Sequence, residues 1–365
     1  MTVPVATVAD MTSHNCDFDL NRPSALIAAL PAVLGFTPVK SLVLVSVEGG
    51  ELGAVMRIDL SAELSDELDR LAEVAAAAEP DAVIAVIVDA DGASCPMCND
   101  EHRQLSDDLA EVLGVRGIEL WAVHVVDRVG AGGRWHCVDG CGSRGRVDDP
   151  TASPVTVAAV LDGRRLYASR AELQAVIAPE ETDEIAGAPT LVDLIGKWRT
   201  DDQARRRQDP DGCARRDVRA ALVAAARVAD GEPLANTDIA HLGSALTDIQ
   251  VRDTLYALAV GESASAAESL WAVLARKLPN PWRVEPLVLL AFSAYARGDG
   301  PLAGVSLEAA LGCDPTHRMA GMLDSALQSG MRPEQIRELA LTGYRLAEQL
   351  GIRLPPRDPF GRRAC

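Results

Sequence analysis

The chain has 365 residues, is 48% hydrophobic and carries a formal net charge of −18 at pH 7. This length exceeds the usual reach of one hydrophobic core, so we expect two domains. Pro31, Gly35 or charged residues interrupt the longest apolar stretches before the roughly 18 positions that a membrane span requires. The strong negative charge disfavours nonspecific binding to nucleic acid or anionic lipid.

The N-terminal sequence lacks a basic region followed by an apolar block, so no signal peptide is expected and the predicted location is the cytoplasm. The expected partner is a protein or small molecule of unknown identity; nucleic acid is disfavoured, and no membrane contact is expected. Residues 199–219 hold seven arginines, but five aspartates lie among them. This mixture predicts a solvated linker or a salt-bridged helix surface rather than a nucleic-acid patch.

Residues 21–180 are predicted to form an α/β domain with Cys-rich loops, after a flexible tail of residues 1–20. A helix is predicted from Pro23 to about Gly35, and Pro31 is expected to kink it or end it early. Two β-rich runs, residues 41–47 and 52–60, flank a Gly-containing connection, which predicts a hairpin.

The pattern then alternates between helix and strand. Helices are predicted near residues 66–78 and 101–113, and buried strands at residues 82–90 and 118–126. A strand, helix and strand in succession predict parallel pairing through a right-handed crossover. Residues 155–179 add either a strand or a short helix and end in a helix, and periodicity does not decide between the two. The sheet is therefore expected to be mixed and partly parallel.

Residues 181–352 are predicted to form an all-α domain, followed by a C-terminal tail of residues 353–365. Strand signals are absent here, and Ala, Leu and Arg dominate between Gly- or Pro-containing breaks. One helix pair has the residue spacing of a tetratricopeptide repeat, with small residues where two helices must approach closely. The positions concerned are Leu290, Ala291, Ala294, Ala303, Leu307, Ala310 and Pro315. We expect a degenerate, tetratricopeptide-like helical domain.

Two long runs carry a family resemblance: "RPSALIAALPAVLGFTPVKSLVLVSV" at residues 22–47, and "PLVLLAFSAYARGDGPLAGVSLEAALGCDPTHRMAGMLDSALQSGMRP" at residues 286–333. Together they closely resemble an actinobacterial family catalogued as domain of unknown function 4192. The loop "GGRWHCVDGCG" is also similar, but it holds its cysteines at a different spacing. The resemblance supports the expected fold and implies no catalytic residues.

Four cysteines are predicted to converge at one edge of the sheet. Cys95 and Cys98 follow the strand that ends near Ala90, and Cys137 and Cys141 follow the strand that ends near Val126. If these two strands are parallel, both loops emerge at the same carboxyl edge. Four thiolates suit tetrahedral zinc, with His102 or His136 as possible substitutes for one cysteine. The predicted metal ligands are therefore Cys95, Cys98, Cys137 and Cys141; the alternative is that they are unliganded cysteines in the loops of a variable insertion.

A redox interpretation stays open for the first pair. Residues 83–127 predict a buried strand, Cys-Pro-Met-Cys, a helix and a strand, which resembles the core of a thioredoxin. Cys95, at a helix N-terminus, would attack a disulfide, and Cys98 would resolve the intermediate. Pro154 is the candidate for the cis-proline of such a protein, although Ser94 stands where an aromatic residue is usual.

Other polar residues near the predicted edge have simpler explanations. His124, inside a buried strand, is expected to be a packing residue. Asp89 and Asp91 are expected to cap the following turn or helix, although strand ends of α/β proteins often carry ligand groups. The favoured interpretation is a cytosolic binding or adaptor protein with a zinc-stabilised Cys-rich loop. The alternatives are a thiol-disulfide oxidoreductase using Cys95 and Cys98, and an enzyme of unknown reaction at the carboxyl edge, so catalysis is left undecided.

Overall fold

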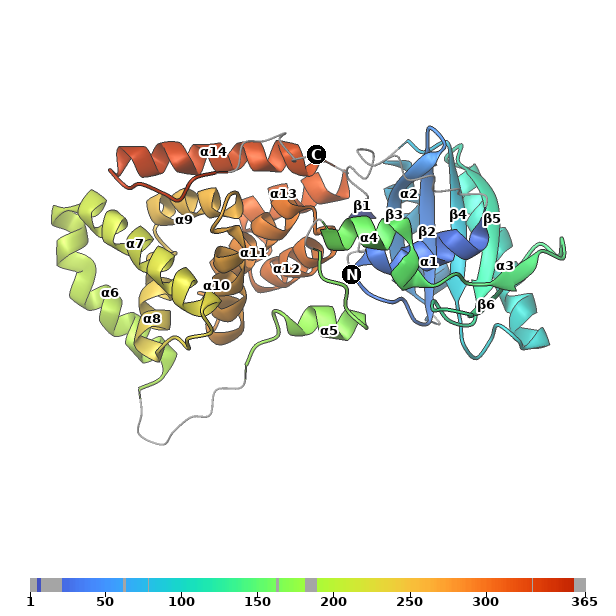
Figure 1. Ribbon diagram of the computed structural model, residues 1–365, viewed down its shortest axis with the longest axis horizontal. Helices are drawn as coiled ribbons and strands as arrows, with labels where there is room; N and C mark the ends of the chain where they lie inside the picture. The colour runs from blue at the N-terminus through green and yellow to red at the C-terminus, as the bar shows by residue number, and fades with distance from the viewer. Residues whose placement is uncertain are drawn as a thin grey trace. The chain divides into compact units, whose positions relative to one another are not determined.

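The computed structural model describes residues 5–7, 22–61, 64–77, 79–161, 164–180, 189–329 and 331–357. The chain divides into two compact units (Figure 1): one of Met1–Leu173 with Ser325–Arg332, and one of Gln174–Asp324 with Pro333–Cys365. The first unit contains a mixed β-sheet flanked by helices, and the second is all-helical. The predicted α/β region followed by an all-α region is therefore confirmed.

The sheet of the first unit has the strand order β1-β3-β2-β4-β5-β6-β7. The strands are β1 (Val5–Thr7), β2 (Ser41–Glu48), β3 (Glu51–Asp59), β4 (Ala82–Val88), β5 (Glu119–Val126), β6 (Arg134–Cys137) and β7 (Arg144–Arg146). β4 and β5 pair in parallel, and the other neighbours are antiparallel. Both the predicted β2–β3 hairpin and the predicted parallel pair are confirmed. β1 forms within the segment that was expected to be a flexible tail; the rest of residues 1–20 lie outside the described residues.

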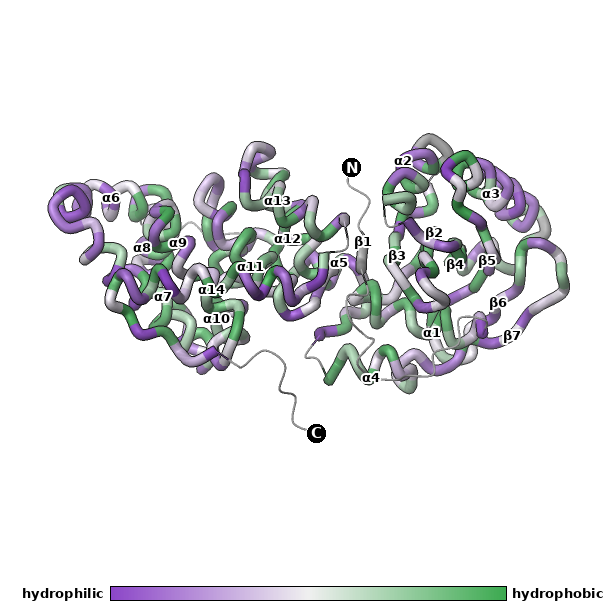
Figure 2. Tube along the Cα trace, turned by 90° about the horizontal axis from the view of Figure 1, so that it is seen from above, coloured by the Kyte–Doolittle hydropathy of each residue, from purple (hydrophilic) through white to green (hydrophobic). Residues whose placement is uncertain are grey.

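Helices cover both faces of this sheet. The first unit contains α1 (Pro23–Leu34), α2 (Leu64–Ala76), α3 (Pro96–Gly114) and α4 (Pro154–Leu161), followed by the short α5 (Arg170–Ala175) at the boundary between the units. Figure 2 shows α2 and α3 on one side of the strands and α1 and α4 on the other. β4 is buried along its whole length, as expected for a strand that is covered on both faces.

The sheet face that α2 and α3 cover determines which side chains of β5 and β6 contact α3. Val123 and Val125 of β5, and Val138 just after β6, belong to the same buried cluster as Leu109 and Leu113 of α3. Successive side chains of a strand point to opposite faces of the sheet. The intervening residues of β5 and β6 therefore face the side that carries α1 and α4.

Two expectations for the first unit are settled by tertiary packing. α1 continues through Pro31 to Leu34 and stops at Gly35, whose φ of 74° is left-handed, so Pro31 does not end the helix. Burial of residues 26–34 outweighs the one backbone hydrogen bond that proline removes. The undecided segment that begins at Val155 is helical and forms α4.

The helical unit follows the predicted breaks. Its helices are α6 (Leu191–Gln208), α7 (Pro210–Ala229), α8 (Asn236–Ala245), α9 (Ile249–Leu255), α10 (Ala264–Lys277), α11 (Val284–Arg297), α12 (Gly300–Cys313) and α14 (Pro333–Gln349), while α13 (Arg318–Gln328) runs across the boundary between the units. Between α11 and α12, Gly298 adopts a left-handed conformation and Asp299 accepts a hydrogen bond from the backbone of Leu302. The helix pair expected here is confirmed; the likeness to a tetratricopeptide repeat stays a prediction.

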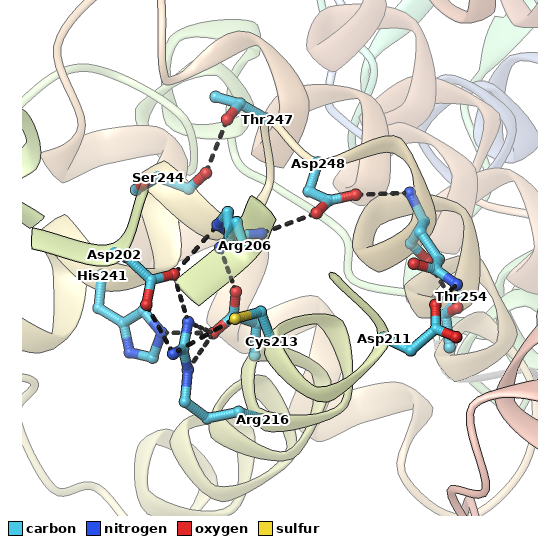
Figure 3. A network of polar contacts seen from close by, with 12 residues as sticks. Asp202, Arg206, Asp211, Cys213, Arg216, His241, Ser244, Thr247, Asp248 and Thr254 are labelled. Carbon is cyan, nitrogen blue, oxygen red and sulfur yellow. Dashed lines mark hydrogen bonds and ion pairs between the residues drawn. The ribbon is translucent and has the colours of Figure 1, made fainter. Parts of the chain in front are cut away.

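The arginine-rich segment forms α6 and α7, whose charged residues build a network of ion pairs (Figure 3). Arg216 donates two hydrogen bonds to the carboxylate of Asp202, at 2.8 and 2.7 Å. The fully buried Asp217 accepts from Arg216 at 2.8 Å, from Nε2 of His241 at 2.9 Å, and from Arg206. Burial alone would raise the pKa of Asp217, but the bonds from His241 and Arg216 and the charge of Arg206 hold this pKa below its usual value. The segment is helical and salt-bridged, as one of the two expected alternatives had it, but two of the carboxylates, Asp202 and Asp217, lie in the core and not on the surface.

Replacing Asp217 by asparagine should destabilise the protein by about 3–5 kcal/mol, because two arginines then lose a buried counter-charge. Urea unfolding at neutral pH measures the change. Asp238→Asn is the matched control, because Asp238 pairs with Arg227 at 2.9 Å but both side chains are partly exposed. The Asp238→Asn control should lose less than about 1 kcal/mol of unfolding free energy. Equal losses in the two variants would contradict a structural role for the buried network.

Candidate functional site

The loops that follow β4 and β5 meet at one edge of the sheet, as parallel pairing requires. Residues 89–95 lead from β4 into α3, and the chain after β5 turns back as β6. A hydrogen bond of 3.0 Å between Nε2 of His136 and Oδ1 of Asn99 joins β6 to the first turns of α3. The expected approach of the two cysteine-bearing segments is therefore present.

The second cysteine-bearing segment is a hairpin, although a loop was expected. Cys137 is the last residue of β6, and Cys141 lies in the turn before β7. Trp135, two positions before Cys137 in β6, is buried and packs in the core. The two strands, RWHC and RGR, have only four and three residues, which is too short to show a periodicity from which they could be predicted.

This hairpin brings three possible metal ligands together. The donor atoms of Cys137, Asp139 and Cys141 all lie within 4.8 Å of one another. Oδ1 of Asp139 accepts a hydrogen bond of 2.9 Å from the backbone N–H of Cys141. This bond, together with bonds from both thiols, holds the pKa of Asp139 below its usual value. Burial and the bond to Asp139 raise the pKa of Cys137 to about 12, so its thiol keeps a proton at neutral pH.

His124 lies beside this group and was not predicted to be functional. It faces Cys137 directly across the β5–β6 pair, so both side chains lie on the same face of the sheet. The ring is 6% exposed, and among the described residues its Nδ1 has no hydrogen-bond partner. The rings of His124 and Trp135 meet edge to face, with 5.3 Å between their centroids. Only the β5–β6 register reveals this neighbourhood, because the two residues are far apart in the sequence.

The first cysteine pair lies at the start of α3. Cys95 is the N-cap residue, and Cys98 follows in the first turn; both are half-buried and reduced. The backbone N–H of Cys98, the thiol of Cys98 and the backbone N–H of Met97 lower the pKa of Cys95. The same contact with Cys95, together with burial, raises the pKa of Cys98. The two thiols therefore differ in acidity, with Cys95 the more acidic.

His102 lies below this pair on the same helix. It is buried, and its Nε2 lies 3.2 Å from Oδ2 of Asp89. The close approach requires a glycine at position 92, since a Cβ there would stand 2.0 Å from Oδ2 of Asp89 and 3.1 Å from Cε1 of His102. Asp89 also accepts a bond of 3.3 Å from the backbone of Asp91, so the predicted turn-capping role of Asp89 is confirmed.

The alternation of side chains along β6 separates the two cysteine pairs between the two faces of the sheet. His136 faces α3 and bonds to Asn99, whereas the next residue, Cys137, points to the opposite face with His124. The three-donor group accordingly contains Cys137 and Cys141, and neither Cys95 nor Cys98. Both candidate substitutes, His102 and His136, lie on the α3 face. A single ion shared by all four thiols stays a prediction.

One feature of the thioredoxin comparison is wrong. Within the described ranges the cis peptide bond is Asn280–Pro281, whereas Pro154 starts the helix α4. The α1/α4 face thus has a helix where that comparison requires a cis-proline before a strand.

None of the described helices combines the length and the apolar composition that crossing a membrane demands.

His124 should make the stability of the protein depend on pH. Burial lowers the pKa of His124 from 6.5 to about 4, so the unfolded chain binds a proton more readily than the folded one between these values. Folding stability should therefore fall as the pH drops through this range, by about 3 kcal/mol when the drop is complete. Urea unfolding at about pH 7 and about pH 4.5, with a chelator present, measures the loss. The His124→Gln variant should lose correspondingly less, and an identical loss in both proteins would contradict the assignment.

The comparisons with known proteins give one match. No curated protein and no solved structure matches the chain. A family model described as "Domain of unknown function (DUF4192)" matches residues 23–334, which include the whole sheet from β2 onward, both cysteine pairs and most of the helical unit. The chain therefore belongs to the family DUF4192.

Proposed function

We propose that this chain is a binding or adaptor protein whose β6–β7 hairpin holds a zinc ion through Cys137, Asp139 and Cys141. The observation that carries the proposal is the convergence of two thiols and one carboxylate within 4.8 Å, in a turn of five residues. Exposed acidic groups are common without a metal, so the two thiols give the group its specificity. Thiolate ligands select zinc over the hard cations magnesium and calcium.

The separation of the donors suits a tetrahedral ion. Zinc binds thiolate sulfur at about 2.3 Å, which places two ligands of a tetrahedron about 3.8 Å apart. Donors that already lie within 4.8 Å need only a small contraction. The turn contains Gly140 and Gly142 in left-handed conformations, which lets the backbone curl around the three donors. The fourth coordination position of the zinc is left to water or to His124, whose side chain lies on the same face of the sheet as that of Cys137.

Zinc binding at this hairpin is coupled to proton release. Both thiols donate to Asp139 in the metal-free protein, and the pKa of Cys137 is raised. Zinc binds the thiolate, so it must displace these protons. The affinity for zinc should therefore increase with pH. On binding, the hydrogen bonds between the thiols and Asp139 are replaced by bonds to the metal.

The binding or adaptor role is supported by the second unit. Consecutive helices pack closely there, with α11 and α12 joined by a tight turn and with Ala291, Ala294 and Ala303 fully buried where small residues were expected at the contact. Stacked helix pairs of this kind commonly build interaction scaffolds. Zinc bound at this hairpin would stiffen the edge of the sheet at which the two cysteine-bearing segments meet.

Metal analysis of the purified full chain tests the proposal. We expect about one zinc per chain, lost in Cys137→Ser and in Cys141→Ser because each removes a thiolate ligand. Two protons should be released per zinc bound, measured by titration in a weakly buffered solution at neutral pH. Asp139→Ala should weaken binding without abolishing it.

Two controls define the donor set. Cys313→Ser removes a half-buried cysteine in the helical unit and should keep the zinc. Cys95→Ser and Cys98→Ser should also keep it. Loss of zinc in these last two variants would replace the proposed site by the four-thiolate site, and a folded wild-type chain that binds no zinc would contradict both.

A further inference from the structure

A stripe along α3 connects the hydrophobic core to the first cysteine pair. Leu109 and Leu105 pack on the sheet, and His102 and Cys98 continue the stripe towards the start of the helix at spacings of three and four residues. Cys95 stands one further turn along, at the N-cap. Cys98 is therefore the inner thiol, directly above His102, and Cys95 is the outer one. None of these residues belongs to the proposed zinc hairpin.

The hydrogen bond between His102 and Asp89, beneath Cys98, fixes the tautomer of His102. The carboxylate of Asp89 can only accept a hydrogen bond, so the Nε2 of His102 that faces it carries the proton. Nδ1 then holds a lone pair. Nδ1 is buried, and within the described ranges it has no hydrogen-bond partner. A buried, unpartnered base one helical turn from a thiol of raised pKa is a costly arrangement for packing alone.

We propose that Cys95 and Cys98 form a dithiol that reduces disulfides of proteins or small molecules, and that His102 accepts the proton of Cys98. This function is separate from zinc binding and does not depend on it.

The reaction proceeds in two exchanges. The Cys95 thiolate attacks one sulfur of the disulfide R–S–S–R′, forming a mixed disulfide, and R′–S⁻ leaves with the electron pair of the broken bond. Cys98 then passes its proton to Nδ1 of His102 and attacks Sγ of Cys95, so that R–S⁻ leaves. The two cysteines are oxidised to a disulfide, and the substrate is reduced to two thiols. An external dithiol in its reduced form then reduces the Cys95–Cys98 disulfide and regenerates the two thiols.

The charges around the pair favour this division of roles. The N-terminus of a 19-residue helix stabilises a thiolate at Cys95. Glu101 on α3 opposes this effect, and Asp89 after β4 acts on Cys98 in the same sense. From β6, His136 approaches the same region, bonded to Asn99. The hydrogen bond to Cys95, burial and the two carboxylates therefore make Cys98 the less acidic thiol, and the helix start keeps Cys95 the nucleophile.

The test uses the full chain and the aromatic disulfide 5,5′-dithiobis(2-nitrobenzoate) in less than stoichiometric amount. In the wild type, each reagent molecule should release two thionitrobenzoates and leave a Cys95–Cys98 disulfide, located by peptide mass analysis. Cys98→Ser should release one and keep a stable mixed disulfide on Cys95. Cys313→Ser, which lacks a half-buried cysteine elsewhere, should behave like the wild type. Reagent bound mainly at other cysteines, or an absent Cys95–Cys98 disulfide, would overturn the proposal.

His102→Asn tests the proton acceptor. The release of the first thionitrobenzoate should be unchanged, and the release of the second should slow by about tenfold or more because the base one helical turn from Cys98 is removed. The pH dependence of the second step should also move to higher pH, which a merely structural residue would not cause. An unchanged second step would overturn the role of His102, even if the dithiol itself is active. The Cys137→Ser/Cys141→Ser double variant should keep both steps, which separates this outcome from the fate of the zinc site.

Discussion

The parallel pairing of β4 with β5 is the constraint on which the chemistry of this protein depends. It requires a crossover, which α3 supplies, and it sends the chain out of the sheet twice at the same edge. The first exit carries Cys95 and Cys98 at the beginning of the crossover helix, and the second turns back into β6. Without this pairing, the hydrogen bond between Asn99 and His136 would join segments that have no reason to meet.

The pleat of the sheet then divides the residues of this edge into two sites. Neighbouring positions of β6 point to opposite faces, so His136 meets α3 while Cys137 meets His124. On one face, an acidic and a less acidic thiol stand above a buried base. On the other, two thiols share a carboxylate, and burial keeps one of them protonated. Thiols of one protein are thus suited to different tasks by their surroundings, in one case a helix start and in the other a desolvated strand end.

The helical unit follows another principle, in which charge replaces apolar packing at the junction of α6 and α7. Asp202 and Asp217 are buried, and two arginines and a histidine satisfy them. The ring of Trp198 stacks on His241 at 4.0 Å between centroids, which covers the network on one side. Such a network is costly to assemble but penalises any arrangement in which a carboxylate loses its partners. An arginine-rich segment that looks like a surface feature in the sequence is in part a core element.

Local patterns in the sequence determined most of the helices, the longer strands, the parallel pairing of β4 with β5 and the class of both units. Continuous apolar runs specified the buried strands, and Asp, Gly and Pro specified the helix ends, because these signals act within a few residues. The same patterns placed both cysteine pairs at one edge. They did not decide that α1 continues through Pro31, that residues 134–146 form two strands, or that His124 lies opposite Cys137. Those outcomes depend on burial and on strand register, which join residues far apart in the chain, so only the tertiary structure could separate the thiol pair above His102 from the thiols grouped around Asp139.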